Sequence, residues 1–285
     1  MRRTVSTFDL GEGPRWFHER WYFVDILQGR LLSLDGGDGE LEPHTLLELE
    51  QPLGAVAAVA GEEPGTWIAA LGDGMAVVRH RKIEWIDRPE AGARPPLRMN
   101  DGVCDPVGRF WAGSMAYDAI DGVGSLFRVD PDGTVERVLD GLTVPNGPAF
   151  SADGATMFLA DSAKGVIRRY SVDVDTGAVG AGEIFATVDD AAPDGMVLDN
   201  EHHLWVAMWG GGRIDRFDQG GRRSESIALP STQPTAPCFG GPSGRELLVT
   251  SASYGLTSPS AVDGAVWHLR STVSGPPSRS ASIQL

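Results

Sequence analysis

The sequence predicts an all-β protein built as a six-bladed β-propeller. A second-strand pattern recurs six times at intervals of 43 to 47 residues, and a third strand that opens with glycine recurs six times at intervals of 41 to 52 residues. Between these runs, apolar residues alternate with period two and turn residues cluster, which is typical of strands and not of helices. A repeat of this length made only of short strands fits a four-stranded blade.

The clearest copy of the repeat spans residues 193–218. It consists of a short apolar strand, a polar turn, a second strand, a glycine hinge and a third strand of alternating character. The second strands begin at Trp21, Trp67, Phe110, Met157, Leu204 and Leu247, and the third strands begin at Gly29, Gly74, Gly124, Gly165, Gly212 and Gly264. Because the two series agree, we expect six copies.

We expect residues 1–285 to form a single propeller domain, since no linker or composition shift divides the chain. Open sheet edges invite aggregation, so the propeller is expected to close on itself. Residues 4–8 are predicted to add a strand to the last blade and thereby join the two ends. Residues 275–285 are rich in proline and serine and are predicted to form a surface tail.

The chain of 285 residues carries a formal net charge of -15, and its acidic residues are spread along the sequence. This charge repels polyanions, so we expect neither nucleic acid nor a membrane as a partner. The sequence lacks a run of eighteen apolar residues and a recognisable secretory leader, which favours a cytoplasmic protein. Cys104 and Cys238 are expected to be reduced. Only Lys82 and Lys164 are lysines among 24 basic residues, which suits a GC-rich bacterial genome.

The predicted first strands carry oxygen-bearing side chains at equivalent places. In a propeller these strands line the central channel, so equivalent residues converge. Aligned on the opening glycine, the positions are Glu12-Gly13, Leu53-Gly54, Asp101-Gly102, Asn146-Gly147 and Asp194-Gly195, with Pro237-Cys238-Phe239 in the sixth blade. Three carboxylates and an amide would repel one another without a cation, and these ligands suit Ca²⁺, Mg²⁺ or Mn²⁺, with Zn²⁺ tolerated.

Asp-Gly and Asn-Gly pairs are also common turn dipeptides, and each pair taken alone is more commonly a turn than a ligand. Because the pairs occupy the same place in each repeat, the interpretation as ligands gains weight over the interpretation as turns. They stand ahead of an apolar strand, where a hairpin turn is not expected. The pattern as a whole therefore favours a cation site.

Five segments carry a family resemblance: LGEGPRW at 10–16, RMNDGVCDPVGRFWAGSM at 98–115, VPNGPAFSADGATMFLADS at 144–162, PDGMVLDNEHHLWVAMWGGGRIDRF at 193–217, and CFGGP with LLVTSAS within 238–253. The chain resembles the gluconolactonase family, which includes regucalcin (senescence marker protein) and luciferin-regenerating enzyme. The resemblance spans nearly the whole chain. It implies a six-bladed propeller with one divalent cation in its channel.

The resemblance also implies roles for individual residues. Glu12, Asn146 and Asp194 would bind the cation directly, and Asp194 would also act as the general base. Asp101 would be a secondary ligand or would support the ligands from behind. The residues expected to bind substrate are Arg98, Asn100 and Asp118.

The expected function is a metal-dependent sugar lactonase that hydrolyses an aldonolactone to the aldonic acid. A carbonyl polarised by the cation and a water activated by Asp194 or by the cation would account for the chemistry, with no further cofactor. The expected partner is a small-molecule lactone, and the chain is expected to be a monomer or a weak homo-oligomer. Alternatives are a hydrolase of a non-sugar lactone or ester, a calcium-binding regulatory propeller without significant turnover, and a protein-interaction propeller.

Overall fold

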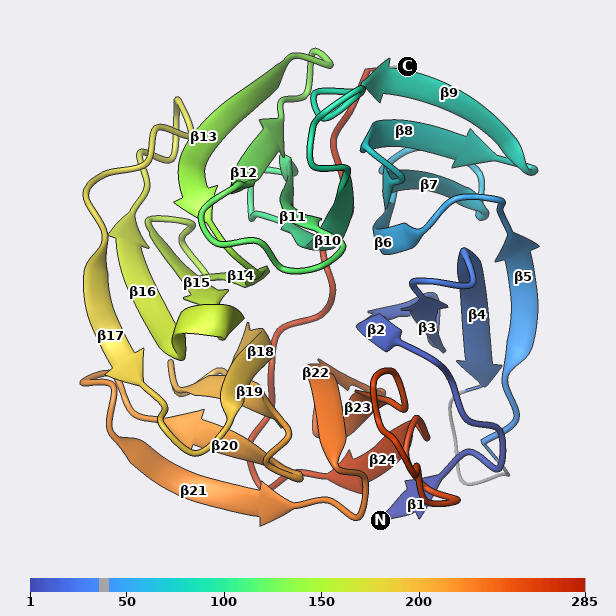
Figure 1. Cartoon of the computed structure of the whole chain (residues 1–285), viewed down its shortest axis with the longest axis vertical. Helices are drawn as coiled ribbons and strands as arrows, with labels where there is room; N and C mark the ends of the chain where they lie inside the picture. Colours follow the sequence, from blue (N-terminus) through green and yellow to red (C-terminus); the bar gives the residue numbers. More distant parts are fainter. Residues whose placement is uncertain (36–40, 285) are drawn as a thin grey trace. The chain divides into compact units, whose positions relative to one another are not determined.

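The structure, a computed structural model, describes residues 1–35 and 41–284. The described residues form 24 strands in six four-stranded antiparallel sheets, and the fold is the predicted six-bladed β-propeller (Figure 1). The chain divides into two compact units, Met1–Glu50 with Val188–Ser278 and Gln51–Thr187 with Arg279–Leu285. Each unit contains three of the sheets. That the whole chain acts as one domain stays a prediction.

The first unit contains the first, fifth and sixth sheets. The first sheet consists of β2 (Gly11–Phe17), β3 (Arg20–Asp25), β4 (Arg30–Asp35) and β5 (His44–Glu48). The fifth consists of β18 (Ala192–Leu198), β19 (Leu204–Trp209), β20 (Arg213–Phe217) and β21 (Arg223–Ala228). The sixth consists of β22 (Gln233–Gly240), β23 (Glu246–Ala252), β24 (Trp267–Arg270) and β1 (Arg2–Arg3).

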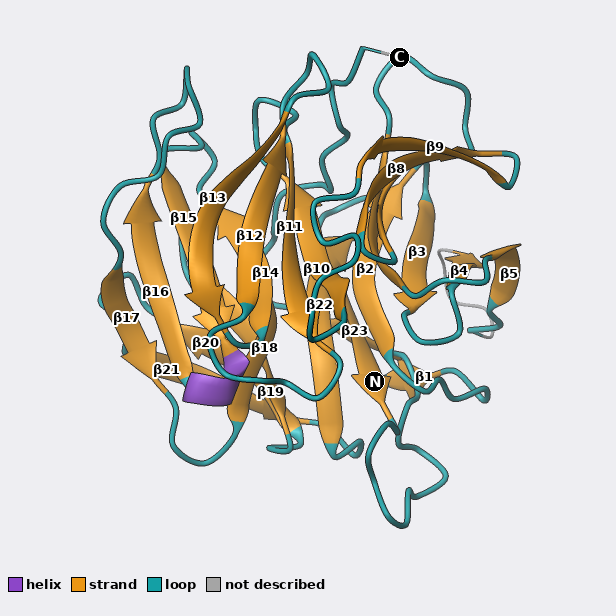
Figure 2. Ribbon diagram, turned by 45° about the horizontal axis from the view of Figure 1, so that its top comes forward, coloured by secondary structure: helices purple, strands orange, loops and turns teal. Residues whose placement is uncertain are grey.

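The second unit contains the other three sheets. Its strands are β6 (Leu53–Ala58), β7 (Thr66–Leu71), β8 (Gly74–Arg79) and β9 (Lys82–Asp87), then β10 (Leu97–Cys104), β11 (Phe110–Ala116), β12 (Gly124–Val129) and β13 (Val135–Leu142), then β14 (Pro145–Phe150), β15 (Thr156–Asp161), β16 (Val166–Ser171) and β17 (Glu183–Thr187). A short 3-10 helix, η1 (Ser162–Lys164), follows β15 and is the purple element in Figure 2. No helix in residues 1–35 and 41–284 is long and apolar enough to cross a membrane.

Second strands are largely buried, and within each unit neighbouring sheets pack against one another. Trp205 of β19 lies in a core cluster with Phe239 of β22 and Leu247 of β23, as expected for a residue between blades. Its indole Nε1 donates to Asp199 at 2.9 Å, and the guanidinium carbon of Arg216 lies 5.7 Å from its ring centroid. These contacts satisfy the one polar atom of a buried tryptophan.

The sixth sheet is completed by the start of the chain, but not by the residues that the sequence suggested. The added strand is Arg2–Arg3, which pairs with His268 and Trp267 of β24. Residues 4–8 contribute single bonds instead: Thr4 N–H donates to Val266 O at 3.0 Å. The Thr4 hydroxyl accepts Val266 N–H and donates to Ser6 O, which turns the backbone away from a regular ladder.

In the segment predicted as a surface tail, residues 275–285, Gly275 and Ala281 are buried, and Leu285 lies outside the described residues. In the first unit, Gly275 packs against the ring of Phe239. In the second unit, Ala281 is buried and pairs in parallel with Val59. Ala281 N–H donates to Ala58 O at 2.8 Å. Small residues let this backbone approach a strand edge closely, a property that composition alone does not reveal.

Candidate active site on the inner strands

The inner strand of every sheet contains an irregularity in its pairing, and five predicted site residues lie at these irregularities: Glu12, Asn100, Asp101, Asn146 and Asp194. Shifts of register occur in β2, β6, β10, β14, β18 and β22. A bulge takes residues out of the ladder and redirects their side chains, and bulges are common next to active sites. The Asp-Gly and Asn-Gly pairs therefore lie inside strands and are not hairpin turns.

The register corrects which residues are equivalent between sheets. In β18, Asp194 and Gly195 are the two residues skipped between paired Pro193 and Met196. In β10, the skipped residues are Asn100 and Asp101, so Asn100 is the counterpart of Asp194. The sequence alignment matched Asp101 with Asp194 because it relied on the glycine that follows each residue. At the second skipped position, however, β10 has Asp101 where β18 has Gly195.

In β22 the skipped residues are Thr235 and Ala236, between paired Pro234 and Pro237. The sixth position therefore precedes the Pro237-Cys238-Phe239 segment that the sequence alignment chose. The sixth blade has neither a glycine nor a carboxylate at the bulge, so its sequence offered no marker for the register. Cys238 is buried, and burial raises the pKa of its thiol.

The three predicted carboxylates share one local arrangement. Each is buried and accepts the N–H of the glycine that follows it: Glu12 Oε2 from Gly13 at 2.8 Å, Asp101 Oδ1 from Gly102 at 2.7 Å, and Asp194 Oδ1 from Gly195 at 3.0 Å. This contact fixes one oxygen of each carboxylate against its own backbone. Bonds from backbone N–H groups help to stabilise a buried charge.

A directed chain of hydrogen bonds links four side chains of the second unit. Arg98 Nη1 donates to Asn100 Oδ1 at 2.7 Å, and Asn100 Nδ2 donates to Asn146 Oδ1 at 2.7 Å. Asn146 Nδ2 donates in turn to Ser162 Oγ at 2.8 Å. Arg98, Asn100 and Asn146 are all buried. The structure therefore brings together two predicted substrate residues and one predicted ligand.

Asp101 has a supporting position beside this chain. Its second oxygen accepts the N–H of Gly147 at 2.9 Å, so one carboxylate joins the bulges of β10 and β14. Gly147 follows Asn146 directly, and the bond holds the backbone from which the Asn146 amide projects. This geometry agrees with a secondary role for Asp101.

In the first unit, Thr235 of β22 contacts both strands that carry predicted carboxylate ligands. Its hydroxyl donates to Gly11 O at 2.5 Å, next to Glu12. On its other side, Gly195 packs so closely that an added Cβ would lie 2.9 Å from Thr235 O. Thr235 and Ser162 were not among the predicted site residues, because single hydroxyls in a sequence carry no distinctive spacing.

Asp118 lies in the exposed connection between β11 and β12. Among the described residues, its carboxylate makes no hydrogen bond with Arg98, Asn100 or Asn146. The connection is held by Asp121, which accepts from Thr143 Oγ1 at 2.7 Å and lies 3.4 Å from Lys164 Nζ. The Thr143 bond, and then Lys164, lower the pKa of Asp121. The contacts of Asp121 thus hold the segment that carries Asp118, but they do not bring Asp118 into contact with the other predicted site residues.

Each predicted ligand, taken by itself, offers an oxygen of the kind that a hard divalent cation binds. Glu12 and Asp194 offer buried carboxylate oxygens, and the amide of Asn146 is held on both sides by hydrogen bonds. An amide oxygen has two lone pairs, so it can accept from Asn100 and also bind a cation. In residues 1–35 and 41–284, no three His, Cys, Asp or Glu side chains cluster as metal ligands.

Comparison with known proteins agrees with these features. Residues 10–253 match the family model described as the SMP-30/Gluconolactonase/LRE-like region. The chain is 33% identical over 300 residues to a pentonolactonase of Haloferax volcanii, covering 100% of this chain and 99% of the relative. It is 34% identical over 277 residues to a 6-deoxy-6-sulfogluconolactonase of Pseudomonas putida, covering 93% and 92%.

The fold matches a solved calcium-binding protein, a regucalcin of Agrobacterium tumefaciens. The TM-score is 0.89 with 29% sequence identity, and the match covers 98% of this chain and 97% of that one. The family model and these relatives each extend over most of the chain. The chain therefore belongs to the SMP-30/gluconolactonase/LRE-like family.

Proposed function

We propose that this protein is a divalent-metal-dependent lactonase that hydrolyses an aldonolactone to the aldonic acid. The observation that carries the proposal is the hydrogen-bond chain from Arg98 through Asn100 to Asn146, because it connects substrate-binding donors to a candidate metal ligand. Relatives named as sugar lactonases support the reaction class.

One cation would be held by Glu12, Asn146 and Asp194, and Ca²⁺, Zn²⁺, Mg²⁺ and Mn²⁺ are the candidates for it. The relative named a calcium-binding protein supports a divalent cation. When bound, such an ion stabilises the negative charge that develops on a carbonyl oxygen under attack.

The side chains supply orientation and proton transfer. Arg98 Nη1 is held by Asn100 Oδ1 and by Met99 O at 3.0 Å, which fixes the plane of the guanidinium. We assign Arg98, Asn100 and Asp118 to the carbonyl and hydroxyl groups of the lactone. Asp194 takes a proton from the attacking water and returns it to the ring oxygen as the acyl C–O bond breaks.

A panel of lactones tests this proposal. Five- and six-carbon aldonolactones, a non-sugar lactone and a simple ester are followed by pH-stat after chelation and after addition of each of the four ions. We expect metal-dependent opening of aldonolactones, and a fall of about 10² to 10⁴ in kcat/KM for Asp194→Asn. Asp218→Asn, in an exposed turn, is the matched control. Turnover that survives both Asp194→Asn and chelation would contradict the site assignment.

The same panel separates the alternatives. Faster opening of the non-sugar lactone or the ester would identify a different substrate on the same site. The relative named a calcium-binding protein favours one further candidate, a calcium-binding regulatory propeller without significant turnover. Tight Ca²⁺ binding with no substrate opened faster than in buffer would support that candidate and overturn the lactonase.

We further propose that the chain acts as a single cytoplasmic domain, either as a monomer or as a weak homo-oligomer. Support comes from Cys104 and Cys238, which are both unbridged and buried, as is usual in a reducing compartment. Light scattering after size exclusion measures the oligomeric state.

A further inference from the structure

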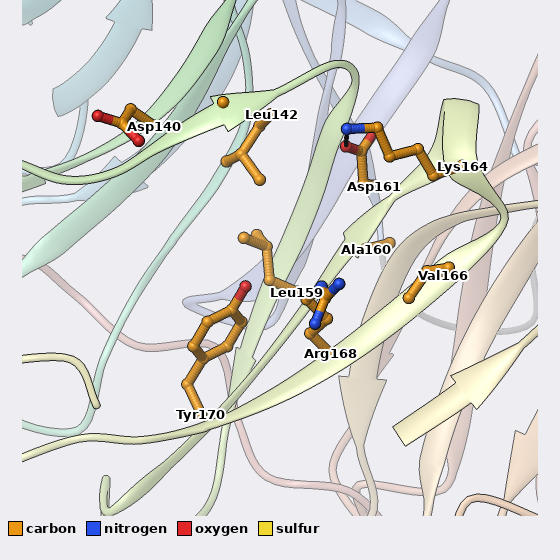
Figure 3. A pocket seen from close by; sticks show the side chains of 10 residues that line it. Asp140, Leu142, Leu159, Ala160, Asp161, Lys164, Val166, Arg168 and Tyr170 are labelled. Atoms are coloured by element: carbon orange, nitrogen blue, oxygen red, sulfur yellow. Dashed lines mark ion pairs between the residues drawn. The ribbon is translucent and has the colours of Figure 1, made fainter. Parts of the chain in front are cut away.

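A cavity lies in the unit of residues 51–187, where the end of β13 faces β15 and β16 (Figure 3). Its volume is about 210 Å³. Metal and substrate residues assigned above do not line it. The side chains that matter for its chemistry are Asp140, Leu142, Leu159, Lys164, Arg168 and Tyr170.

The cavity has an apolar wall and a polar wall. Leu142 and Leu159 belong to a buried apolar cluster and line one side. Arg168 and Tyr170 are two positions apart on β16, so their side chains extend from the same face of the strand. A ligand with a carbon skeleton and polar substituents would complement both walls.

Tyr170 is the buried polar group of this cavity. The residue as a whole is 6% exposed, and among the described residues its hydroxyl has no hydrogen-bond partner. Figure 3 shows the hydroxyl pointing from β16 toward Leu159, with the guanidinium of Arg168 on the other side of Leu159 in this view. Because Tyr170 lines the cavity, its hydroxyl is accessible there and can bond with a ligand.

The charged side chains around the cavity differ in whether they have partners within the protein. Asp161 accepts the N–H groups of Thr143 and Val144 and lies 3.6 Å from Lys164. By contrast, the guanidinium of the exposed Arg168 forms no ion pair or hydrogen bond with any described residue. Its charge acts on Tyr170, whose pKa is raised by burial and lowered in smaller part by Arg168. Tyr170 therefore remains a protonated donor at neutral pH beside an available guanidinium.

We propose that this cavity binds a small hydroxylated monocarboxylate, with the carboxylate on Arg168 and a hydroxyl group on Tyr170. A guanidinium and a carboxylate form charge-assisted hydrogen bonds. Asp140 and Asp161 disfavour a ligand with two negative charges, such as phosphate, and Asp140 at the rim accepts from ligand hydroxyls. An aldonic acid, the product of the proposed lactonase, is a hydroxylated monocarboxylate of this kind. Regulation of the enzyme by its product would rest on the proposed function, whereas binding of the carboxylate does not.

Fluorine NMR of protein labelled with 3-fluorotyrosine tests the proposal, because the chain has only four tyrosines. Tyr170→Phe assigns the Tyr170 resonance, and sodium D-gluconate is the probe. We expect a saturable shift of the Tyr170 resonance, weakened at least about tenfold by Arg168→Gln. No saturable shift, or an unchanged titration in Arg168→Gln, would overturn the proposal.

The remaining tyrosines serve as internal controls. Tyr117 adjoins Asp118 and reports the candidate active site, whereas Tyr22 and Tyr254 lie in the other unit and report that the fold of each variant is kept. D-Glucose, which lacks the carboxylate, is expected to leave Tyr170 unchanged. Inorganic phosphate that shifts Tyr170 where gluconate does not would overturn the ligand class. Asp194→Asn is expected to retain the gluconate shift, so loss of lactonase activity and loss of this site are separate outcomes.

Discussion

At the scale of single residues, Asn146 shows how a candidate ligand is oriented. Its oxygen accepts from Asn100 and its nitrogen donates to Ser162, so the two ends of the amide are distinguished by their partners. Without the acceptor on Ser162, the amide would lose the contact that keeps its oxygen on the side of Asn100. Groups that hold a ligand in place commonly change metal affinity without touching the metal.

Replacing Ser162 by alanine is therefore expected to weaken the apparent metal affinity by about tenfold while kcat at saturating metal is largely kept. Titration of the metal-free enzyme with Mn²⁺ or Ca²⁺, followed by activity and by direct binding, measures both quantities. Ser280→Ala in the C-terminal segment is the control. An unchanged metal titration in Ser162→Ala would show that Asn146 does not need this contact.

At the scale of elements, the close approach of neighbouring inner strands depends on glycine. In β6, an added Cβ on Gly54 would collide with the carbonyl oxygen of Asn100 and lie 3.0 Å from Met99 O. Both are backbone atoms of β10, which cannot move aside as a flexible side chain would. The spacing of β6 and β10 thus places the strand that carries Arg98 and Asn100.

Gly54→Ala is expected to destabilise the protein by about 1–3 kcal/mol, as overpacking usually does. It should also lower kcat/KM for the preferred lactone, because β10 must shift. Urea unfolding and steady-state kinetics provide the two measurements. Gly220→Ala, where an added Cβ would lie 3.3 Å from Oδ1 of Asp218, is expected to change neither. Equal effects of the two substitutions would show that the strand spacing is not responsible.

The sequence was sufficient to predict the six repeats, because each blade repeats the same order of short strands and turns. The same pattern could not supply the register of the inner strands. The bulge is a property of the backbone and does not require one residue type. Its second skipped residue is Gly195 in β18, but Asp101 in β10 and Ala236 in β22. The pairing of Ala281 with Val59 was also not predicted, since it is made by backbone groups that every residue possesses.

At the scale of the whole molecule, the start and the end of the strand order meet in the sixth sheet. His268 of β24 accepts from Arg2 at 3.0 Å through Nδ1 and donates to Glu246 at 2.9 Å through Nε2. This arrangement requires a neutral ring. Burial lowers the pKa of His268, with Glu246 acting in the opposite direction and Arg2 and Arg270 in the same direction.

Because the unfolded chain binds the proton more readily than the folded one, stability should fall as pH drops below about 6.5. The free energy of unfolding in urea, measured at pH 7 and pH 5, gives this difference. In His268→Gln, the part of this pH 7 to pH 5 difference that is due to His268 should disappear. The altered hydrogen bonds should also lower the free energy of unfolding at pH 7 by about 1 kcal/mol. His44→Gln, on exposed β5, should keep the wild-type difference. A full pH dependence in His268→Gln would assign the effect to other groups.

The bulge shared by the inner strands has a consequence for how such a protein evolves. Its geometry is fixed by strand pairing and accepts aspartate, asparagine, threonine or glycine as the first skipped residue. A mutation in one repeat can therefore alter the chemistry presented there while the other repeats continue to maintain the sheets. Duplication of a blade supplies new positions of the same kind, so catalytic diversity in this architecture can accumulate one repeat at a time.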